Sequence, residues 1–307
     1  MSDLNHQLVA VLVITYNSSN TILETLESIK AQTYPNIELI ISDDCSTDDT
    51  IDICHKWIAE NGSRFARTEI IESPTNTGIA ANCNRAEDAC RAKWVKLLAG
   101  DDLLLPECID TYMHYVAGRD DLPCLFSRVQ CFSAIDGKDV NDFAAFDYRF
   151  FSLSREQQLH HLLYEGNCIP AATVFINLSL MRQLGIRNDE RIPMLEDLPK
   201  WINVLNAGYR LEFLDRKLVR YRVFNGISTV EASPSFYYSG LLYTLLYQYP
   251  EWKKRDSNDA YRRLRECMGD AKPPLGIRDR RSLRVGRFIL SPVYQAKDII
   301  KRIKRRK

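Results

Sequence analysis

The chain has 307 residues, of which 45% are apolar and 26% charged, with 13 Gly and 12 Pro. This composition is that of an ordinary globular protein and excludes a disordered tail, a collagen-like chain and a small disulfide-stapled scaffold. The formal net charge is +1, but residues 278–307 hold 12 Lys and Arg against 2 Asp, so this basic tail carries +10 and the remainder −9.

The nine cysteines are scattered along the chain and include no Cys-x-x-Cys pair. This pattern predicts reduced, mostly buried thiols rather than a zinc ribbon or a disulfide framework. Residues 1–7 are polar, and the apolar run 8–14 is far shorter than the ~20 residues that span a bilayer. We therefore expect a cytoplasmic protein without a signal peptide.

The first hundred residues alternate short apolar runs with helical periodicity, which predicts an α/β fold with a mostly parallel sheet. We expect strands at 8–15, 37–42, 69–72 and 94–99. The helices between them carry apolar stripes such as Ile51, Cys54 and Ile58. Gly78 opens the third helix, and Pro106 suits the first turn of the helix that follows the fourth strand.

The second half has a weaker pattern. We expect, in chain order, a strand at 122–132, a long loop at 134–151, a helix at 154–164, a strand at 172–176, a helix at 195–206, a pair of short strands at 210–221 around Asp215, and an aromatic helix at 235–249 ended by Pro250. Apolar residues recur among the cations of the basic tail, which is compatible with a basic amphipathic helix.

Ligands of open α/β sheets bind outside the carboxyl ends of the strands, and three of the expected strands end in polar residues. These residues are Thr15, Tyr16 and Asn17, then Asp43 and Asp44, then Gly100, Asp101 and Asp102. We expect all three groups to converge on one edge of the sheet. No Gly-x-Gly-x-x-Gly or Gly-Lys-Ser/Thr loop follows the strands, which argues against a dehydrogenase and a P-loop enzyme.

Carboxylates that lie close together repel each other unless they are protonated or bridged by a metal. Mg²⁺ and Mn²⁺ are usually held by one or two carboxylates together with substrate phosphates. The acidic strand ends therefore point to a nucleotide-diphosphate substrate.

Six segments carry a more specific signal: Val11–Asn17, Asp43–Thr50, Asn76–Gly78, Asn82–Arg85, Lys96–Leu103 and Leu195–Asp197. In order and spacing they resemble glycosyltransferase family 2, over roughly residues 8–225. The resemblance implies a GT-A fold and transfer from a nucleotide-activated sugar with inversion. It also implies a GT-A domain at 1–227, with a nucleotide-sugar-binding half at 1–121 and an acceptor-side half at 122–227. The helical patterns beyond it predict a helical extension at 228–307.

The resemblance also assigns roles to residues on the nucleotide side. It implies that Thr15 and Asp44 lie against the base and ribose, with Asp44 accepting from the base, and that Asp101 binds a ribose hydroxyl. Asp102 would hold the Mn²⁺ or Mg²⁺ that bridges both phosphates. The further nucleotide-binding candidates are Tyr16, Asn17, Asn76, Gly78 and Asn84.

The sequence departs from many relatives at three positions. Ala99 stands where many have another acid, and Cys83 replaces a common Arg. The segment Tyr221–Phe224 lacks the His expected on the diphosphate, so Arg222 is the candidate for that contact.

An inverting displacement needs a base on one side of the sugar and charge stabilisation of the leaving group on the other. The resemblance implies that Asp197 is the catalytic base, with Glu196 as the alternative. The five histidines form no obvious Ser/His/Asp or Cys/His arrangement and are expected to be structural or exposed.

Taken singly, each motif also has a structural interpretation. The Asp43–Thr50 and Asp101–Asp102 segments could be acidic turns that cap helices, acids in the first turn of a helix are favoured by its dipole, and Arg85 could be a surface cation. The occurrence of all these motifs together, in the order typical of the family, favours the functional interpretation.

We therefore expect a bacterial, metal-dependent enzyme that moves a sugar to a lipid-linked glycan acceptor in surface-polysaccharide synthesis. UDP is the default nucleotide, with GDP and dTDP open. The basic tail would dock the protein on the anionic inner face of the cell membrane. Nucleic acid is a less favoured partner because the body is acidic. A sugar nucleotidyltransferase and a non-catalytic nucleotide-sugar-binding scaffold are the alternatives.

Overall fold

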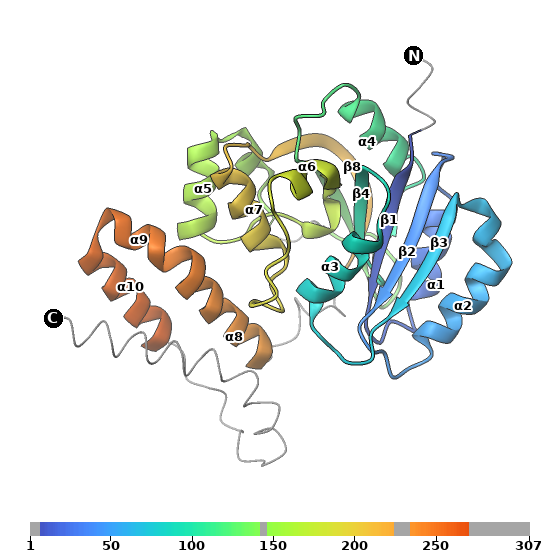
Figure 1. Cartoon of the computed structure of the whole chain (residues 1–307), viewed down its shortest axis with the longest axis horizontal. Helices are drawn as coiled ribbons and strands as arrows, with labels where there is room; N and C mark the ends of the chain where they lie inside the picture. The colour runs from blue at the N-terminus through green and yellow to red at the C-terminus, as the bar shows by residue number, and fades with distance from the viewer. Residues whose placement is uncertain (1–6, 142–145, 224–233, 270–307) are drawn as a thin grey trace, which may run out of the picture. The chain divides into compact units, whose positions relative to one another are not determined.

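The computed structural model describes residues 7–141, 146–223 and 234–269 (Figure 1). The chain forms two compact units: residues 1–190 with 196–229, and residues 191–195 with 230–307. The short segment 191–195 thus groups with the C-terminal unit although it precedes the last helix of the first unit.

The first unit is built on one eight-stranded sheet with the order β3-β2-β1-β4-β7-β6-β8-β5. The strands are β1 Val9–Thr15, β2 Ile37–Asp43, β3 Arg67–Glu72, β4 Trp94–Ala99, β5 Leu103–Leu104, β6 Cys124–Ser133, β7 Phe175–Asn177 and β8 Glu212–Val223. β1 pairs in parallel with both β2 and β4, β2 pairs in parallel with β3, and β6 pairs in parallel with β8. β7 is antiparallel to β4 and β6, and β5 is antiparallel to β8. The predicted α/β fold with a mostly parallel sheet is confirmed.

Helices connect these strands. They are α1 Ile22–Lys30, α2 Thr50–Asn61, α3 Ile79–Ala89, α4 Cys108–Val116, α5 Arg155–Tyr164, α6 Leu178–Gln183 and α7 Asp197–Asn206, with short 3-10 turns at Gly62–Arg64, Tyr148–Ser152 and Ala171–Thr173. α5 begins at a capping box in which Ser154 and Gln157 satisfy each other's backbone N–H groups.

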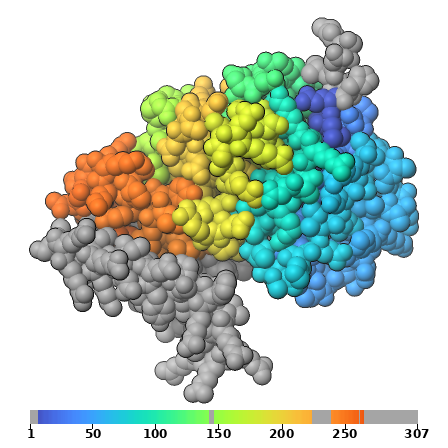
Figure 2. Space-filling model, viewed as in Figure 1, coloured from blue at the N-terminus to red at the C-terminus, as the bar shows by residue number. Residues whose placement is uncertain are grey.

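The two faces of β1 contribute to different layers. Val9, Val11 and Val13 join a buried apolar cluster with residues of α1, α2 and α4. The opposite face of β1 and β2 is covered by α3. Figure 1 shows α1 and α2 on one side of β1–β3 and α3 on the other, and in Figure 2 the side chains of this region form a continuous surface over the strands. A sheet covered on both faces explains the continuous apolar runs of β1 and β2.

Several predicted elements need correction. The region 210–221 is one continuous strand, β8, rather than two short strands, because at Asp215 the chain shifts register against β6 at Ser127/Arg128 without turning back. The side chain of Asp215 is held there by Arg128. The predicted strand 172–176 begins instead as a 3-10 turn, and its paired part is the three-residue β7. In α2 the buried residue beside Cys54 is Trp57, whereas Ile51 and Ile58 are only partly buried.

From residue 234 on, the described part of the second unit is helical: α8 Pro234–Tyr243, a π-helical turn Thr244–Gln248, α9 Tyr249–Arg255 and α10 Ser257–Gly269. Pro250 does not end a helix as predicted. It lies in the first turn of α9, directly after the π-helical turn Thr244–Gln248, and the helix continues past it to Arg255. The basic tail from Arg278 onward lies outside the described residues. No helix in the described ranges is long and apolar enough to cross a bilayer.

Candidate functional site

The ends of β1, β2 and β4 come together at the carboxyl edge of the sheet, as the sequence predicts. Thr15 and Asp43 are register partners, and the Thr15 hydroxyl donates to the Asp43 carboxylate at 2.7 Å. The N–H of Gly100, directly after β4, donates to the carbonyl of Ile14 at 3.0 Å. Three polar loops that are distant in sequence therefore form one surface.

The loop after β2 is built around two acids with different partners. Asp43 is buried and accepts from the Ser46 backbone N–H at 2.7 Å and from the Ser46 hydroxyl at 2.5 Å, so it shapes the loop. Asp44 accepts from the backbone N–H groups of Thr77 and Gly78 at 2.9 and 2.7 Å. Asp44 thereby fixes the start of α3 at the nucleotide side of the sheet.

Arg85 and Asn82 complete this corner, and both were underestimated from the sequence. Arg85 donates to Asp44 at 3.2 Å and to the Asn82 side chain at 2.9 Å, so it is not simply a surface cation. Asn82 is 1% exposed, accepts from Ser42 at 2.6 Å and donates to the Thr15 carbonyl at 3.2 Å. Asn82 and Arg85 are three residues apart on α3 and therefore share one helix face, the face that meets the strand ends. This spacing is the sequence signal that could have identified them.

The loops that follow β1 and β2 have backbone conformations that most side chains avoid. Asn17 and Cys45 have φ of 52° and 69°, the left-handed region that favours glycine. Asn17 is held there because its side chain accepts from the Thr47 backbone N–H at 2.8 Å. Such strained residues tend to persist at functional sites where the surroundings fix them. Tyr16, between β1 and Asn17, is 51% exposed, and Asn76 is exposed in the loop before α3.

The acid pair after β4 lies against β8. Asp102 is 2% exposed and accepts from the backbone N–H of Arg222 at 2.9 Å. The Arg222 guanidinium donates to the Asp101 carbonyl at 2.7 Å, pairs with Glu24 at 2.8 Å and lies over the Phe132 ring at 4.5 Å. The structure thus brings the diphosphate candidate Arg222 to the two acids, although they are more than a hundred residues apart in the sequence.

Burial raises the pKa of both Asp101 and Asp102, and the Asp101 carboxylate raises that of Asp102 further. A buried carboxylate beside a half-buried one, both of which resist ionisation, would be stabilised by a hard divalent cation, and their oxygens are the ligands that Mg²⁺ and Mn²⁺ prefer. In the described ranges no three His, Cys, Asp or Glu side chains gather into a complete metal cage. The residues present therefore fit an ion held by one or two carboxylates together with substrate phosphates.

The candidate base lies at the start of α7. One oxygen of Asp197 accepts from the Leu198 backbone N–H at 2.6 Å, and the other accepts from the side chain of Asn167 at 2.7 Å. Loss of hydration raises the pKa of Asp197 and outweighs these two hydrogen bonds, which lower it. Loss of hydration and the Asp197 charge raise the pKa of Glu196 to about 8. No sequence signal marks Asn167, because its relation to Asp197 is purely spatial.

The acid pair is connected to the nucleotide side through α3. Cys83 is 1% exposed, and the charges of Glu196 and Asp197 help to raise the pKa of its thiol. Cys83 is five residues after Gly78, about 7.5 Å along the helix axis. The start of α7 is therefore beside the first turns of α3.

Asn84, a predicted nucleotide contact, lies elsewhere. It is 3% exposed, donates to the Asn188 carbonyl and to Glu190, and accepts from the backbone and side-chain N–H groups of Asn188. These bonds use its whole hydrogen-bonding capacity. In this structure Asn84 fastens α3 to the segment that precedes α7 instead of facing the strand ends.

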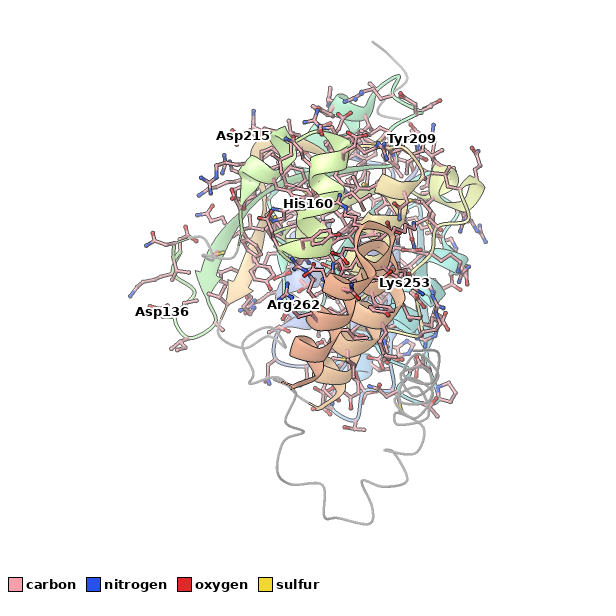
Figure 3. The ribbon with its side chains drawn as sticks, turned by 90° about the vertical axis from the view of Figure 1, so that its left-hand side faces the viewer. Asp136, His160, Tyr209, Asp215, Lys253 and Arg262 are labelled. Atoms are coloured by element: carbon pink, nitrogen blue, oxygen red, sulfur yellow. The ribbon has the colours of Figure 1, made fainter. Side chains whose placement is uncertain are left out.

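The described histidines form no catalytic arrangement. His55 and His114 contact Glu72 and Asp110, and His161 contacts Glu165. His160 stacks on Tyr164 and lies on α5 (Figure 3). The eight cysteines whose side chains are described are free, and all but Cys45 are buried.

Comparison with known proteins decides the family. The model described as glycosyl transferase family 2 matches residues 10–169, more than half of the 307 residues. The chain belongs to glycosyltransferase family 2. It is therefore a transferase, and the match includes the three strand ends but stops before Asp197.

Curated family 2 relatives match most of this glycosyltransferase. The putative teichuronic acid biosynthesis glycosyltransferase TuaG of Bacillus subtilis is 27% identical over 71% of this chain and 80% of its own length. WfaP of Escherichia coli, a UDP-Glc:α-D-GlcNAc-diphosphoundecaprenol β-1,3-glucosyltransferase, is 27% identical over 72% of this chain and 79% of its own. An uncharacterized glycosyltransferase of Methanocaldococcus jannaschii, MJ1057, is 25% identical over 73% and 74%.

Solved structures establish the fold of this family 2 member. Residues 1–349 of S. aureus TarS in complex with UDP-GlcNAc superpose with a TM-score of 0.57 at 21% identity, over 78% of this chain and 66% of that one. A longer TarS chain is covered over only 39% of its length. The chain thus spans less than two thirds of these TarS chains. The likeness confirms the GT-A fold.

Proposed function

We propose that this family 2 glycosyltransferase is a metal-dependent, inverting enzyme that moves a sugar from a UDP-sugar to a hydroxyl of a lipid-linked glycan in bacterial surface-polysaccharide synthesis. The observation that carries the proposal is the convergence of the β1, β2 and β4 ends with Arg222 on one edge of the sheet. That edge is where ligands bind in open α/β sheets.

The relatives support the donor and acceptor classes. The TarS chain was crystallised with UDP-GlcNAc, and the name of WfaP gives UDP-Glc as donor and a diphosphoundecaprenol-linked GlcNAc as acceptor. TuaG is named for teichuronic acid biosynthesis. O-antigen, capsule and exopolysaccharide are therefore the product classes that we propose, with GDP and dTDP as the alternative nucleotides.

We assign the nucleotide to the surface formed by Thr15, Tyr16, Asn17 and the Asp44 loop. In this structure both oxygens of Asp44 already accept from Thr77, Gly78 and Arg85. A base N–H that bonds to Asp44 would therefore share an oxygen with one of these donors. Asp101 would accept from a ribose hydroxyl.

Asp102, with Asp101 beside it, would hold Mn²⁺ or Mg²⁺ against the diphosphate. A bound divalent ion supplies charge stabilisation for the departing nucleoside diphosphate. For Arg222 to contact the diphosphate, its guanidinium would exchange the ion pair with the exposed Glu24 for the substrate oxygens.

Asp197 is the proposed base that takes the proton of the acceptor hydroxyl. Its two hydrogen bonds, from Leu198 and Asn167, fix the plane of the carboxylate and favour the ionised form that a base needs. Glu196, whose pKa is raised to about 8, is largely protonated at neutral pH and is the poorer base.

The donor half of the proposal is tested by thermal unfolding of the purified chain with Mn²⁺ and UDP, GDP or dTDP, against metal alone and nucleotide alone. A nucleotide at 100 times its dissociation constant adds about 2.7 kcal/mol to the free energy of unfolding. We expect UDP to stabilise the chain only in the presence of metal. If none of the three nucleotides stabilises it, the donor assignment is wrong.

The catalytic half is tested with Asp197→Asn and a polyprenyl-diphosphate-linked GlcNAc acceptor. We expect the variant to keep the metal-dependent stabilisation by UDP and to lose transfer from UDP-glucose and UDP-GlcNAc. Stabilisation by UDP without any transfer by the unaltered chain, across a panel of acceptors, would instead support a non-catalytic nucleotide-sugar scaffold.

A further inference from the structure

A buried ion pair joins α3 to α7. The Lys200 ammonium lies 2.5 Å from the Glu87 carboxylate, and the two side chains are only 2% and 6% exposed. Asn188 bridges the pair, because its amide donates to Glu87 at 3.2 Å and its oxygen accepts from Lys200 at 3.4 Å. The pair is thus fully embedded in a hydrogen-bonded network.

Burying such a pair is a poor way to gain stability. The loss of hydration offsets most of the attraction between the two charges, and replacing buried pairs by apolar side chains often leaves stability unchanged or higher. We therefore look for the role of the Glu87–Lys200 pair in the position of its two helices or in the charges of its surroundings, rather than in stability.

The pair occupies the connection between the two halves of the proposed site. Gly78 directly precedes α3 and its N–H donates to Asp44, whereas Glu87 lies in the last turn of that helix. Lys200 is three residues after Asp197 on α7, so the two side chains lie on neighbouring positions of one helix face. The N-terminal end of α3 is therefore bonded to the loop that holds Asp44, and its C-terminal end carries Glu87, the partner of Lys200.

The same charges act on one another. Burial is the main cause that raises the pKa of the Cys83 thiol; the charges of Glu196, Glu87 and Asp197 raise it further and that of Lys200 lowers it, which places the thiol within reach of all four charges. The Lys200 charge also lowers the pKa of Glu196. The groups near the acid pair are thus Lys200 from α7 and, from α3, Cys83 and the Lys200 partner Glu87. Asn84, Asn188 and Glu190 complete the network, and Arg187 acts on Glu87 and Glu190 from the surface.

We propose that Glu87 and Lys200 form a positioning pair, which fixes the start of α7 against α3 and sets the charge balance around the Glu196–Asp197 carboxyl pair. The proposal rests on the proposed role of Asp197 as base. Glu87 and Lys200 themselves touch neither substrate nor reacting atoms.

The test is the carboxyl titration of Glu196 in the full chain, followed by ¹³C NMR with ¹³C-carboxyl-labelled glutamate and assigned by comparison with Glu196→Gln. Lys200→Met removes the buried cation and should raise the midpoint by about one pH unit. Glu87→Gln keeps an acceptor for Lys200 but removes the balancing negative charge, so it should lower the midpoint. The double variant should return the midpoint to its original position.

A merely structural pair predicts a different result. It would lower thermal stability in both single variants without displacing the titration in opposite directions. Midpoints that stay fixed, or that move in the same direction, overturn the proposal. If Lys200→Met does not fold, Glu87→Gln and the double variant still give two midpoints whose difference decides the question.

Asp88→Asn is the matched control. Asp88 is the next residue on α3 and also pairs across to the segment before α7, through Arg187 at 2.7 Å, but both partners are more than half exposed. The same acid-to-amide change should leave the Glu196 titration in place, and an equal displacement there would also overturn the proposal.

A transfer assay separates this proposal from the proposed function. The acid-side midpoint of the pH profile of kcat/KM, which reports the base Asp197, should move in the same direction as the Glu196 titration, with UDP affinity unchanged. If Asp197→Asn remains active, the proposed function fails. The NMR titration still decides whether Glu87 and Lys200 shift the ionisation of Glu196.

Discussion

At the scale of single residues, Gly100 is the point where the loop after β4 passes closest to β1. A Cβ atom placed on Gly100 would lie 2.9 Å from the Thr15 methyl group and 3.1 Å from the Ser18 hydroxyl. Thr15 is buried and hydrogen-bonded to Asp43, so it cannot move without disturbing the strand ends.

We therefore predict that Gly100→Ala lowers the free energy of unfolding by about 1–3 kcal/mol, the range for overpacking a filled site. Gly240→Ala, within α8 and with no atom near its added Cβ, should instead gain up to about 1 kcal/mol from helix propensity. Chemical denaturation of both variants checks the contrast. A Gly100→Ala variant as stable as the original would contradict the close approach.

Glu196 makes stability depend on pH. Its pKa is about 8 in the folded chain against an ordinary 4.5, so the folded state holds the proton more tightly than the unfolded state. The stability that this group contributes is therefore present below pH 4.5 and is lost as pH rises toward 8. The limiting slope for one group is about 1.4 kcal/mol per pH unit.

We predict that Glu196→Gln removes the loss of stability that Glu196 causes at high pH, because the amide carries no charge at any pH. The gain in melting temperature over the original chain should be larger at about pH 8.5, just above that window, than at about pH 5, near its lower end. Asp88→Asn, at an exposed acid, serves as the reference. A gain that does not grow with pH would show that Glu196 ionises normally.

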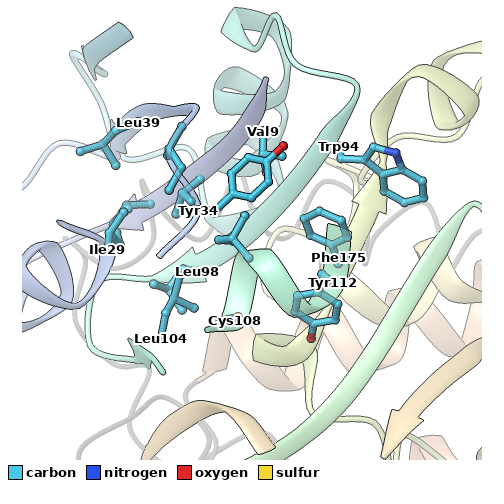
Figure 4. Packing of buried hydrophobic residues seen from close by; sticks show 14 of the residues in the cluster. Val9, Ile29, Tyr34, Leu39, Trp94, Leu98, Leu104, Cys108, Tyr112 and Phe175 are labelled. Carbon is cyan, nitrogen blue, oxygen red and sulfur yellow. The ribbon is translucent and has the colours of Figure 1, made fainter. Parts of the chain in front are cut away.

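At the scale of elements, the short strand β7 depends on one aromatic stack. Phe175 is fully buried and stacks between Trp94 of β4 at 5.3 Å and Tyr112 of α4 at 4.8 Å, as Figure 4 shows. β7 has only three residues, yet it is the strand between β4 and β6. The stack therefore fixes β7 against β4 and α4.

We predict that Phe175→Ala lowers the free energy of unfolding by about 3–5 kcal/mol, since it leaves a cavity in a filled core. Leu23→Ala, at a residue of α1 that is 50% exposed, should change it by less than about 0.5 kcal/mol. Urea denaturation of both variants provides the measurement. Similar losses in both would mean that the stack contributes little.

The elements also show where sequence patterns suffice and where they do not. β4 was predicted with its observed ends, because the apolar residues of Trp94–Ala99 are interrupted only by the buried Lys96. β8 was predicted as two strands because Asp215 and its charged neighbours look like a turn. Its middle is exposed and its register shifts against β6, so only the pairing shows that the strand is continuous. By contrast, Asp136 does lie on a turn, directly after the end of β6, and Figure 3 shows it there.

At the scale of the whole molecule, the basic tail is the feature that we propose for membrane docking. Residues 278–307 carry +10, and each cation near an anionic leaflet contributes about 1 kcal/mol. We predict that the full chain sediments with vesicles that contain anionic lipid and that a chain ending at Pro273 does not. Neutral phosphatidylcholine vesicles and high salt are the controls, because both remove the electrostatic attraction. Equal sedimentation of the shortened chain would contradict the role of the tail.

The sequence by itself determined the α/β class, the family and the polar strand ends of the candidate site. These features are encoded locally, by apolar runs, by helical spacing and by short motifs that directly follow strands. Asp44, Asp101 and Asp102 could be chosen for this reason before any contact was known.

Only the tertiary structure decided which side chains meet. Glu87 and Lys200 are 113 residues apart, Asn167 reaches Asp197 across 30 residues, and Arg222 reaches Asp101 across 121. The tertiary structure also shows that Asn84, which was predicted to contact the nucleotide, bonds instead to Asn188 in the segment that precedes α7. Contacts of this kind follow from how helices pack on the sheet, and periodicity along one element carries no information about the partner on another.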